Sequence, residues 1–507
     1  MAYDDLQSFL SALDQAGELR RITVPVDPVL EVAEIADRVS KSPTRDGQWP
    51  ASGPPPFGPH KPQHGTTGVN QALLFQAVKG SDIPLAINTF GSYDRLHKAL
   101  GCENLDALAQ RVADITKPEP PVGLMDKIRK GLDLLKLAGY SPKIRSGSGL
   151  CQQVVHTDDA DITRLPVIQC WPKDGGKYIT FGQIITRHPE TGARNMGMYR
   201  VQVFDKKLTA MHWHMHHDGA RHFRAWKKLG RPCPLAIVLG GESVLPYSAT
   251  APLPPGIDEH LFAGFLMGRG LDLVACKTIP LEVPANAEIV VEGFVDPAQT
   301  ILEGPFGDHT GFYSLADQYP VFRVTAITHR KNPVYPTTIV GKPPQEDYYL
   351  GKATERIFLP LLKILIPDIL DYDLPMFGAF HNCAIIKIRK DYPYHARKVI
   401  HAVWGAGQMA WTKMVIVVDE QVDVHNLDDV LFHVAANVDP RRDTFIAEGP
   451  LDILDHAAPF MGAGSKLGID ATCKWPGEGT VRDWPEELAM DDATVATVTR
   501  RWKDYGF

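Results

Sequence analysis

The chain has 507 residues, of which 44% are hydrophobic and 22% are charged, and its net charge at neutral pH is −7. This size and balance are typical of a globular protein of about two to four domains, and the acidic charge argues against nucleic acid as a partner. The most apolar stretch is interrupted by Pro360, Lys363 and Pro367, and the seven cysteines form no C-x-x-C pair, so we expect a cytoplasmic protein with reduced thiols.

Residues 1–120 predict an N-terminal α/β domain. Hydrophobic periodicity indicates alternating helices and strands, over 5–16, 19–24, 29–39, 72–78, 85–89 and 105–115. The intervening residues 40–68 are rich in Pro, Gly and His and show no periodicity. This composition indicates a long surface loop or insertion.

Residues 121–340 predict a strand-rich domain. Short runs separated by Gly, Pro and Asp indicate strands over 178–186, 197–204, 208–216, 235–239, 288–294 and 321–328. This spacing is typical of an open or closed barrel with short helices inserted.

The last third of the chain predicts a linker helix followed by a separate α/β domain. A helical pattern over 348–365 places the linker at residues 341–366. Strand and helix patterns then alternate over 384–388, 396–404, 413–418, 427–436 and 444–446. This alternation predicts an α/β domain over 367–507, so the whole chain is expected to be a mixed α+β and α/β multidomain protein.

The segment from Glu303 to Gly311 places two carboxylates, Glu303 and Asp308, on either side of a Gly-Pro-Phe-Gly turn, with His309 next to the second. A lone pair of acids is more often solvated than functional. Loops on rigid scaffolds nevertheless carry much of protein function, and paired carboxylates are common in general acid/base chemistry. The motifs upstream of this loop favour the functional interpretation.

A cluster of histidines precedes it. In an extended chain His212, His214 and His216 would share one face. Such a face can hold a metal, form a polar pocket wall or be solvated. One hypothesis is therefore a metallohydrolase with these three histidines as a zinc triad and Glu303 as base.

Five motifs occur together in one order. They are Asn195-x-Gly197-x-Tyr199-Arg200, His216-His217-Asp218-Gly219-Ala220, Pro255-Gly256-Ile257-Asp258-Glu259, the segment Glu303 to Gly311, and Gly464-Ser465-Lys466-Leu467-Gly468-Ile469-Asp470-Ala471-Thr472. In this order they resemble the UbiD family of prenylated-FMN-dependent decarboxylases, over about residues 5–485. The resemblance implies a split β-barrel flavin-binding domain, a linker helix and a C-terminal oligomerisation domain.

The resemblance also implies a cofactor site. The cofactor would be prenylated FMN, supplied by a flavin prenyltransferase and bound with Mn²⁺ and a monovalent cation such as K⁺. The implied manganese ligands are Asn195, His216 and Glu259, and an amide, an imidazole and a carboxylate suit such a cation. The implied cofactor contacts are Met198, Tyr199, Arg200, His212, Trp213, His214, His217 and Asp218, with Lys466 in a Gly-Ser-Lys turn at the phosphate.

The implied catalytic residues are Arg200, Glu303 and Asp308. Loss of CO₂ from an aromatic acid leaves a carbanion that no side chain can delocalise, so a cofactor has to act as electron sink. Arg200 would hold a carboxylate and Glu303 would donate the proton that replaces CO₂. Asp308 would tune that proton or donate it, because coupled carboxylates share protons.

Asp308-His309-Thr310-Gly311 and Lys474-Trp475-Pro476-Gly477-Glu478 are similar to the quinone-pathway branch of the family. We therefore expect a 4-hydroxy-3-polyprenylbenzoate-like substrate, with a dihydroxynaphthoate of menaquinone biosynthesis as the alternative. A polyprenyl chain would imply an apolar groove or contact with a membrane surface. The resemblance further implies a homo-oligomer, either a dimer or a trimer of dimers, whereas a non-catalytic flavin carrier would need no Glu303.

Overall fold

The computed structural model describes residues 1–47, 68–116, 138–214, 217–254 and 256–507. Most of the predicted insertion, the boundary predicted after residue 120, and His216 lie outside these residues. The four-part division of the chain therefore stays a prediction. All seven cysteines are free thiols, and no helix in the described ranges combines the length and apolarity of a membrane span.

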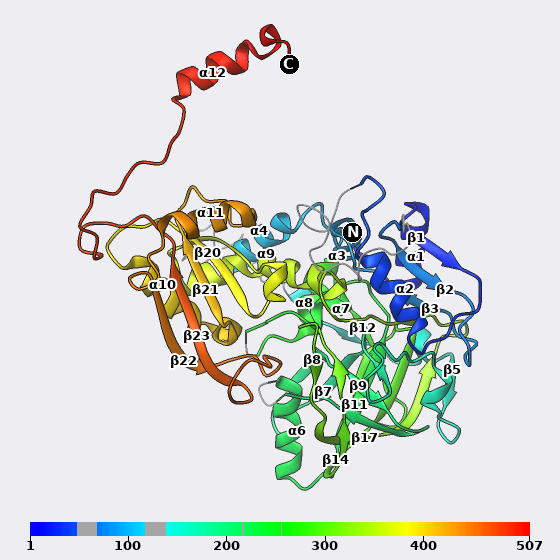
Figure 1. Cartoon of the computed structure of the whole chain (residues 1–507). Helices are drawn as coiled ribbons and strands as arrows, with labels where there is room; N and C mark the ends of the chain where they lie inside the picture. The colour runs from blue at the N-terminus through cyan, green and yellow to red at the C-terminus, as the bar shows by residue number, and fades with distance from the viewer. Residues whose placement is uncertain (48–67, 117–137, 215–216, 255) are drawn as a thin grey trace, which may run out of the picture.

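The N-terminal part is a four-stranded sheet with helices packed on it (Figure 1). Its strands, in spatial order, are β1 (Leu19–Ile22), β2 (Ala72–Phe75), β3 (Leu85–Ile87) and β18 (Tyr335–Pro336). Its helices are α1 (Leu6–Gln15), α2 (Glu31–Ser40), α3 (Tyr93–Leu100) and α4 (Leu105–Thr116). The Asp5 carboxylate accepts a hydrogen bond from the Ser8 amide and so caps α1. The sequence did not predict α3, which has only eight residues, or the return of the chain at β18.

The central part is a nine-stranded antiparallel sheet. Along it the order is β6 (Lys177–Ile179), β9 (Val201–Val203), β10 (Leu208–Met211), β17 (Asp317–His329), β14 (Ile289–Glu303), β11 (Cys233–Leu239), β7 (Gln183–Arg187) and β8 (Arg194–Met198), with β5 (Val154–His156) also on β17. The ends β6 and β8 are not paired with each other in the described part of the chain. The sheet is therefore a half-barrel. Of the open and closed barrels that the sequence allowed, the closed one is not seen in the described residues.

Shorter elements complete the central part. The helices are α6 (Asp218–Lys228), α7 (Leu245–Ser248) and α8 (Glu259–Met267). The small strands are β4 (Lys143–Ile144), β12 (Asp272–Ala275), β13 (Glu282–Pro284), β15 (Phe306–Gly307) and β16 (Tyr313–Ser314). Two predicted strands, over 178–186 and 197–204, are each divided in two. The second division leaves Tyr199 and Arg200 between β8 and β9, where a side chain can leave the plane of the sheet.

The C-terminal part follows the helix α9 (Glu346–Leu365). Its five strands lie in the order β19 (Ile369–Asp373), β20 (Cys383–Ile388), β21 (Met414–Val418), β23 (Ala463–Asp470) and β22 (Thr444–Pro450). Val415 and Val417 pack on the side of α10 (His395–Trp404), whereas Ile416 and Val418 pack with Val430 of α11 (Leu427–Asn437). This alternation along β21 matches the two buried faces of a sheet between helices. The chain ends in α12 (Asp492–Arg500), which lies away from the rest of the molecule (Figure 1).

Candidate active site

Arg200 is the centre of a buried ionic network. Its Nε donates to Oε1 of Glu303 at 2.8 Å, and its Nη1 donates to Oδ2 of Asp308 at 2.6 Å. Its Nη2 lies 3.0 Å from Oγ of Ser314, and the guanidinium lies over the Phe306 ring at 4.6 Å. The Arg200 and Glu303 side chains are 8% and 0% exposed. The structure therefore brings together the three residues predicted as catalytic.

The local fold explains how this network is held. Glu303 is the last residue of β14, where it pairs with Asp317 of β17. The loop that follows folds back through the β15–β16 hairpin, and the Gly304 amide donates to Oε1 of Gln202 at 2.9 Å. The Gly307 amide donates to Oδ1 of Asp174 at 2.8 Å. Both ends of the turn are thus fixed to the central sheet region, which sets the separation of the two carboxylates.

Charge compensation controls the two acids. Burial would raise the pKa of Glu303, but a hydrogen bond from His212, whose Nδ1 lies 2.9 Å from Oε2, and the Arg200 guanidinium lower that pKa to about 2. Burial is likewise outweighed at Asp308, where His309 and Arg200 hold the pKa well below its usual range. His309 Nδ1 lies 2.9 Å from Oδ1 of Asp308. Both carboxylates are therefore ionised at neutral pH in this arrangement.

The histidine cluster differs from its prediction. The strand predicted over 208–216 ends at Met211, so the expected face of three histidines on one strand is wrong. His212 still contacts His214, with 2.7 Å between the two Nε2 atoms, and its other ring nitrogen faces Glu303. The 2.7 Å between the two Nε2 atoms is a hydrogen-bond distance and is too short for two ligands of one tetrahedral metal, which argues against a zinc triad. The third member, His216, lies outside the described residues.

The other residues predicted to contact the cofactor lie around the start of α6. The Tyr199 and Trp213 rings pack edge to face with 6.4 Å between centroids, and Trp213 is buried whereas Tyr199 is partly buried. The His214 and His217 rings stack at 4.8 Å. Asp218 opens α6 and pairs with Arg221 at 3.0 Å. Met198 is the last residue of β8, two positions before Arg200.

A cavity of about 250 Å³ lies beside two of the predicted manganese ligands. Asn195 of β8 and Glu259, the first residue of α8, both line it. Burial raises the pKa of Glu259 to about 7, and the amide nitrogen of Asn195 has no hydrogen-bond partner among the described residues. A partly buried carboxylate with no lysine or arginine partner among the described residues fits a hard divalent cation, for which the amide oxygen of Asn195 would be a second ligand, leaving its N–H free to donate to an anion.

Lys466 lies elsewhere. It was predicted in a turn, but it is an inner residue of β23, 2% exposed, and its Nζ donates to the Thr412 carbonyl at 3.1 Å and also to the Ala410 carbonyl. The Gly-Ser-Lys pattern resembled a turn because glycine breaks local periodicity. Pairing with β21 and β22 on both sides overrides that tendency.

Three further residues near His309 were not predicted from the sequence and are found only in the structure. Phe380 and His381, after β19, pack against the His309 ring with centroids 5.1 and 4.9 Å away. Asp347, in the first turn of α9, is partly buried, and desolvation raises its pKa to about 7. It lies close enough to favour a charged His309. The C-terminal part therefore closes one side of the site. An acid at a helix start looks like ordinary helix capping, so no pattern in the sequence marked Asp347.

Comparison with known proteins places the chain among carboxy-lyases. Three models of 3-octaprenyl-4-hydroxybenzoate carboxy-lyase match the chain, the N-terminal domain at 10–115, the Rift-related domain at 143–343 and the C-terminal domain at 348–471. An uncharacterised protein of Aquifex aeolicus is 47% identical over 99% of both chains.

Two solved structures share the whole architecture. The UbiD-class enzyme HmfF from Pelotomaculum thermopropionicum, in complex with FMN, is 26% identical, with a TM-score of 0.75 over 96% of this chain and 97% of its own. The vanillic acid decarboxylase of Sedimentibacter hydroxybenzoicus, in its closed form, is 26% identical, with a TM-score of 0.83 over 99% of both chains.

Proposed function

The chain belongs to the UbiD family of carboxy-lyases, and we propose that it removes CO₂ from a hydroxyaryl carboxylic acid with prenylated FMN in quinone biosynthesis. The observation that carries the proposal is the buried contact of Arg200 with both Glu303 and Asp308. This arrangement supplies a cation for a carboxylate and two acids for proton transfer. The reaction is reversible in principle, so the same residues would serve carboxylation.

The cofactor would lie between Arg200 and the Asn195–Glu259 cavity. Asn195, Glu259 and His216 would hold Mn²⁺, and the side chains around Tyr199, Trp213 and the start of α6 would contact the flavin. When bound, prenylated FMN supplies the electron sink for the carbanion left by CO₂. A monovalent cation such as K⁺ stays part of the proposal.

Arg200 and Glu303 would share the work on the substrate. A substrate carboxylate near Arg200 would compete with Glu303 for the guanidinium donors. Once Arg200 is diverted, the pKa of Glu303 would rise from about 2, because burial would then be opposed by the His212 hydrogen bond alone. Glu303 could then hold a proton and deliver it from its carboxyl oxygen to the carbon that has lost CO₂.

Asp308 would stay ionised through His309 and keep Arg200 in place. Substrate binding would therefore change the hydrogen-bond partners of Glu303 but not the His309 contact of Asp308. It favours Glu303 as the donor over Asp308.

The aromatic ring of the substrate is proposed from the substrates of similar proteins. The matching models describe a carboxy-lyase for 3-octaprenyl-4-hydroxybenzoate, and a solved relative acts on vanillic acid. Both acids carry a hydroxyl group on the benzoate ring. We infer a 4-hydroxy-3-polyprenylbenzoate-like substrate, and a dihydroxynaphthoate is the competitor to test beside it. The enzyme would need to contact a membrane surface only if its substrate carries a polyprenyl chain.

Two protein partners belong to the proposal. A flavin prenyltransferase would supply the cofactor, and a second copy of the chain would form a dimer, or a trimer of dimers, through the C-terminal part. The exposed apolar side chains of the tail, such as Leu488 at 100% and Phe507 at 77%, suit such a contact. Sedimentation of the cofactor-loaded enzyme as a monomer would contradict the oligomer.

The test is co-expression with a flavin prenyltransferase, followed by mass spectrometry of the released cofactor and metal analysis. We expect prenylated FMN, one Mn²⁺ per chain, and CO₂ release from a hydroxyaryl acid in a panel of benzoates and naphthoates. Zinc without flavin would overturn the proposal in favour of a hydrolase. A flavin carrier would be favoured if the cofactor is bound but no panel member releases CO₂, and if Glu303→Gln binds the cofactor as wild type does.

A further inference from the structure

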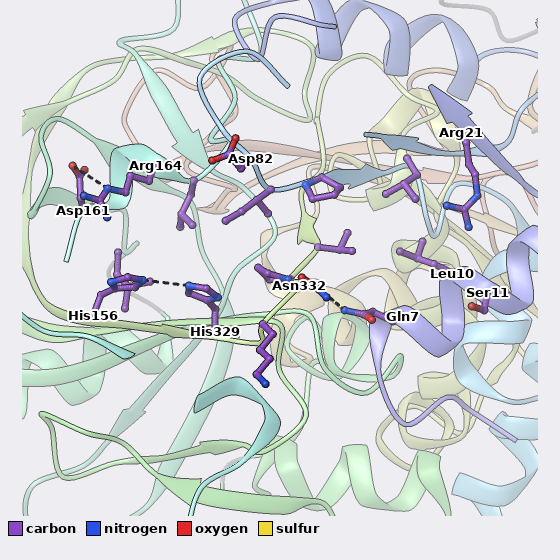
Figure 2. Close-up of a pocket in the computed structure, with 18 of the residues that line it drawn as sticks. Gln7, Leu10, Ser11, Arg21, Asp82, His156, Asp161, Arg164, His329 and Asn332 are labelled. Carbon is purple, nitrogen blue, oxygen red and sulfur yellow. Dashed lines mark hydrogen bonds and ion pairs between the residues drawn. The ribbon is translucent and has the colours of Figure 1, made fainter. Parts of the chain in front are cut away.

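A second cavity, of about 710 Å³, lies between the N-terminal sheet and the edge of the central sheet. Its volume is within the range of small-molecule sites. Neither Arg200 nor the Asn195–Glu259 cavity contributes to it. Figure 2 shows two of its lining residues, His156 and His329, with their rings facing each other across one end.

Two paired strands fix this histidine pair. His156 is the last residue of β5 and His329 is the last residue of β17. The antiparallel register sets His156 opposite Ile327 and Val154 opposite His329. The two histidines are therefore diagonal neighbours on one face of the sheet, within reach of each other. Their separation is set by backbone hydrogen bonds and does not depend on a loop.

The outer nitrogen of each ring is already engaged. Nδ1 of His156 lies 2.9 Å from a carboxylate oxygen of Asp159, and Nδ1 of His329 lies 2.5 Å from the Arg330 carbonyl oxygen. A carboxylate and a carbonyl only accept hydrogen bonds, so both Nδ1 atoms carry protons. In neutral rings, both Nε2 atoms are then bare acceptors.

These two Nε2 atoms lie 3.4 Å apart, with ring centroids at 5.4 Å. The rings thus meet through their Nε2 edges. Two lone pairs at this distance repel each other unless a cation lies between them. Two imidazole nitrogens on one tetrahedral metal, each at about 2.0–2.1 Å, are about 3.3–3.4 Å apart. By contrast, His212 and His214 in the candidate active site are 2.7 Å apart, which is a hydrogen-bond distance.

We propose that His156 and His329 bind a divalent transition metal of the zinc class, with its remaining coordination positions open to the 710 Å³ cavity. Imidazole is a preferred ligand of such metals. Metal-binding histidines almost always donate their other N–H to a carboxylate or a backbone carbonyl, and both of these partners occur here. The cavity lining carries both signs of charge, with Asp82, Asp159 and Asp161 beside Arg21, Arg164 and Lys331, so the proposal rests on the geometry of the two histidines.

A second cluster of possible metal ligands differs from the histidine pair because a lysine already neutralises it. Glu355, Asp373 and His425 also approach one another closely enough to share an ion. There, however, the Lys352 ammonium bonds Glu355 at 2.6 Å and also bonds Asp373. The cation is therefore already supplied by the chain. At the histidine pair, each Nε2 atom faces the other, and among the described residues the neighbouring cation Arg164 pairs with Asp159 at 3.7 Å and not with either ring.

The test is equilibrium dialysis of the Mn²⁺- and cofactor-loaded enzyme against Zn²⁺, with metal analysis, in wild type and in His156→Gln and His329→Gln. We expect one additional zinc per chain in wild type and at least about tenfold weaker binding in either variant. His401→Gln removes an exposed imidazole on α10 and serves as the matched control. Cu²⁺ in place of Zn²⁺ should give an electron paramagnetic resonance spectrum with two nitrogen ligands, which is reduced in both variants.

Asp159→Asn tests the same site without removing a ligand. It should weaken zinc binding by roughly tenfold, because the partner that orients His156 is altered. This variant also covers the case in which a histidine variant fails to fold. Equal zinc content in wild type and in all three variants would overturn the proposal. A wild-type enzyme that binds no additional zinc would also overturn it, and the two Nε2 atoms would then share one proton instead of a metal. Neither result depends on decarboxylase activity, whose rate should be unchanged in His156→Gln.

Discussion

Glu303 is buried and Glu259 is partly buried, and the pKa values of these two carboxylates of the central part move in opposite directions. Burial acts to raise the pKa in both cases. At Glu303, His212 and Arg200 outweigh it and lower the pKa to about 2. At Glu259, whose main hydrogen bond comes from the Met196 amide at 2.9 Å, the pKa is raised to about 7.

The difference lies in where the compensating cation comes from. The chain supplies it for Glu303 through Arg200. For Glu259 no ion pair with a lysine or arginine is found in the part of the chain that the structure describes. A carboxylate of the first kind is suited to proton transfer that depends on a shift of Arg200. A carboxylate of the second kind is suited to binding a cation from solution.

The largest effect is expected from Glu303→Gln. The amide keeps the size of the side chain but cannot deliver a proton, so kcat for CO₂ release should fall by ~10²–10⁴-fold. Cofactor and manganese content should stay unchanged, because Glu303 lies outside the cavity beside Asn195. The measurement is steady-state CO₂ release with the cofactor content of each preparation determined.

Glu190→Gln, at an exposed turn residue, is the control for this change. A loss of less than tenfold in Glu303→Gln would remove Glu303 from proton transfer and leave Asp308 as the candidate donor.

The second largest effect is expected from Glu259→Gln, which should change both the metal content and the pH dependence of stability. Without metal, the raised pKa means that the folded state holds its proton more tightly than the unfolded state, where Glu titrates near 4.5. This contribution to stability is therefore complete below pH ~4.5 and is lost as pH rises through about 7. The difference, about 2.5 pKa units from 4.5 to about 7, corresponds to about 3 kcal/mol.

Thermal unfolding of the metal-free protein between pH 5 and 7.5 measures this slope. Wild type should lose stability over that range, and both Mn²⁺ and Glu259→Gln should reduce the slope by the contribution of Glu259, leaving the part that groups such as Asp347 and Asp174 contribute through their raised pKa values. The variant should also lose its manganese. Glu303 adds no slope here, because its lowered pKa places its contribution above pH ~4.5 and its loss near pH 2. A wild-type slope that is unchanged by Mn²⁺ would contradict a metal at Glu259.

Much of this arrangement was predictable where a local pattern determines the structure. The linker helix was predicted over 348–365 and is found at Glu346–Leu365, because its apolar periodicity is long. Glu303 and Asp308 were recognised because two glycines and a proline between them exclude a helix. Their contact with Arg200 came from the family resemblance, since no local pattern gives a contact across 100 residues.

Other features depend on tertiary packing and could not be predicted from the sequence. The strand after residue 208 ends at Met211 because His212 turns toward Glu303. Asp347 and Phe380 reach the site only because α9 and the segment after β19 pack beside His309. Tertiary contacts of this kind override local propensity.

The smallest effect on activity is expected from Lys466→Met. The contact of Lys466 with the cofactor phosphate stays a prediction, but its ammonium bonds two backbone carbonyls within the C-terminal part, at Ala410 and Thr412. Methionine fills the space and leaves both carbonyls short of a donor, at a cost of ~1–3 kcal/mol. The thermal midpoint should therefore fall while cofactor content stays within about twofold of wild type. Lys228→Met, on the exposed side of α6, is the control and should change neither quantity. Loss of cofactor at an unchanged midpoint would instead make Lys466 a phosphate ligand, and the cation for the cofactor phosphate would then come from the chain, as it does at Glu303.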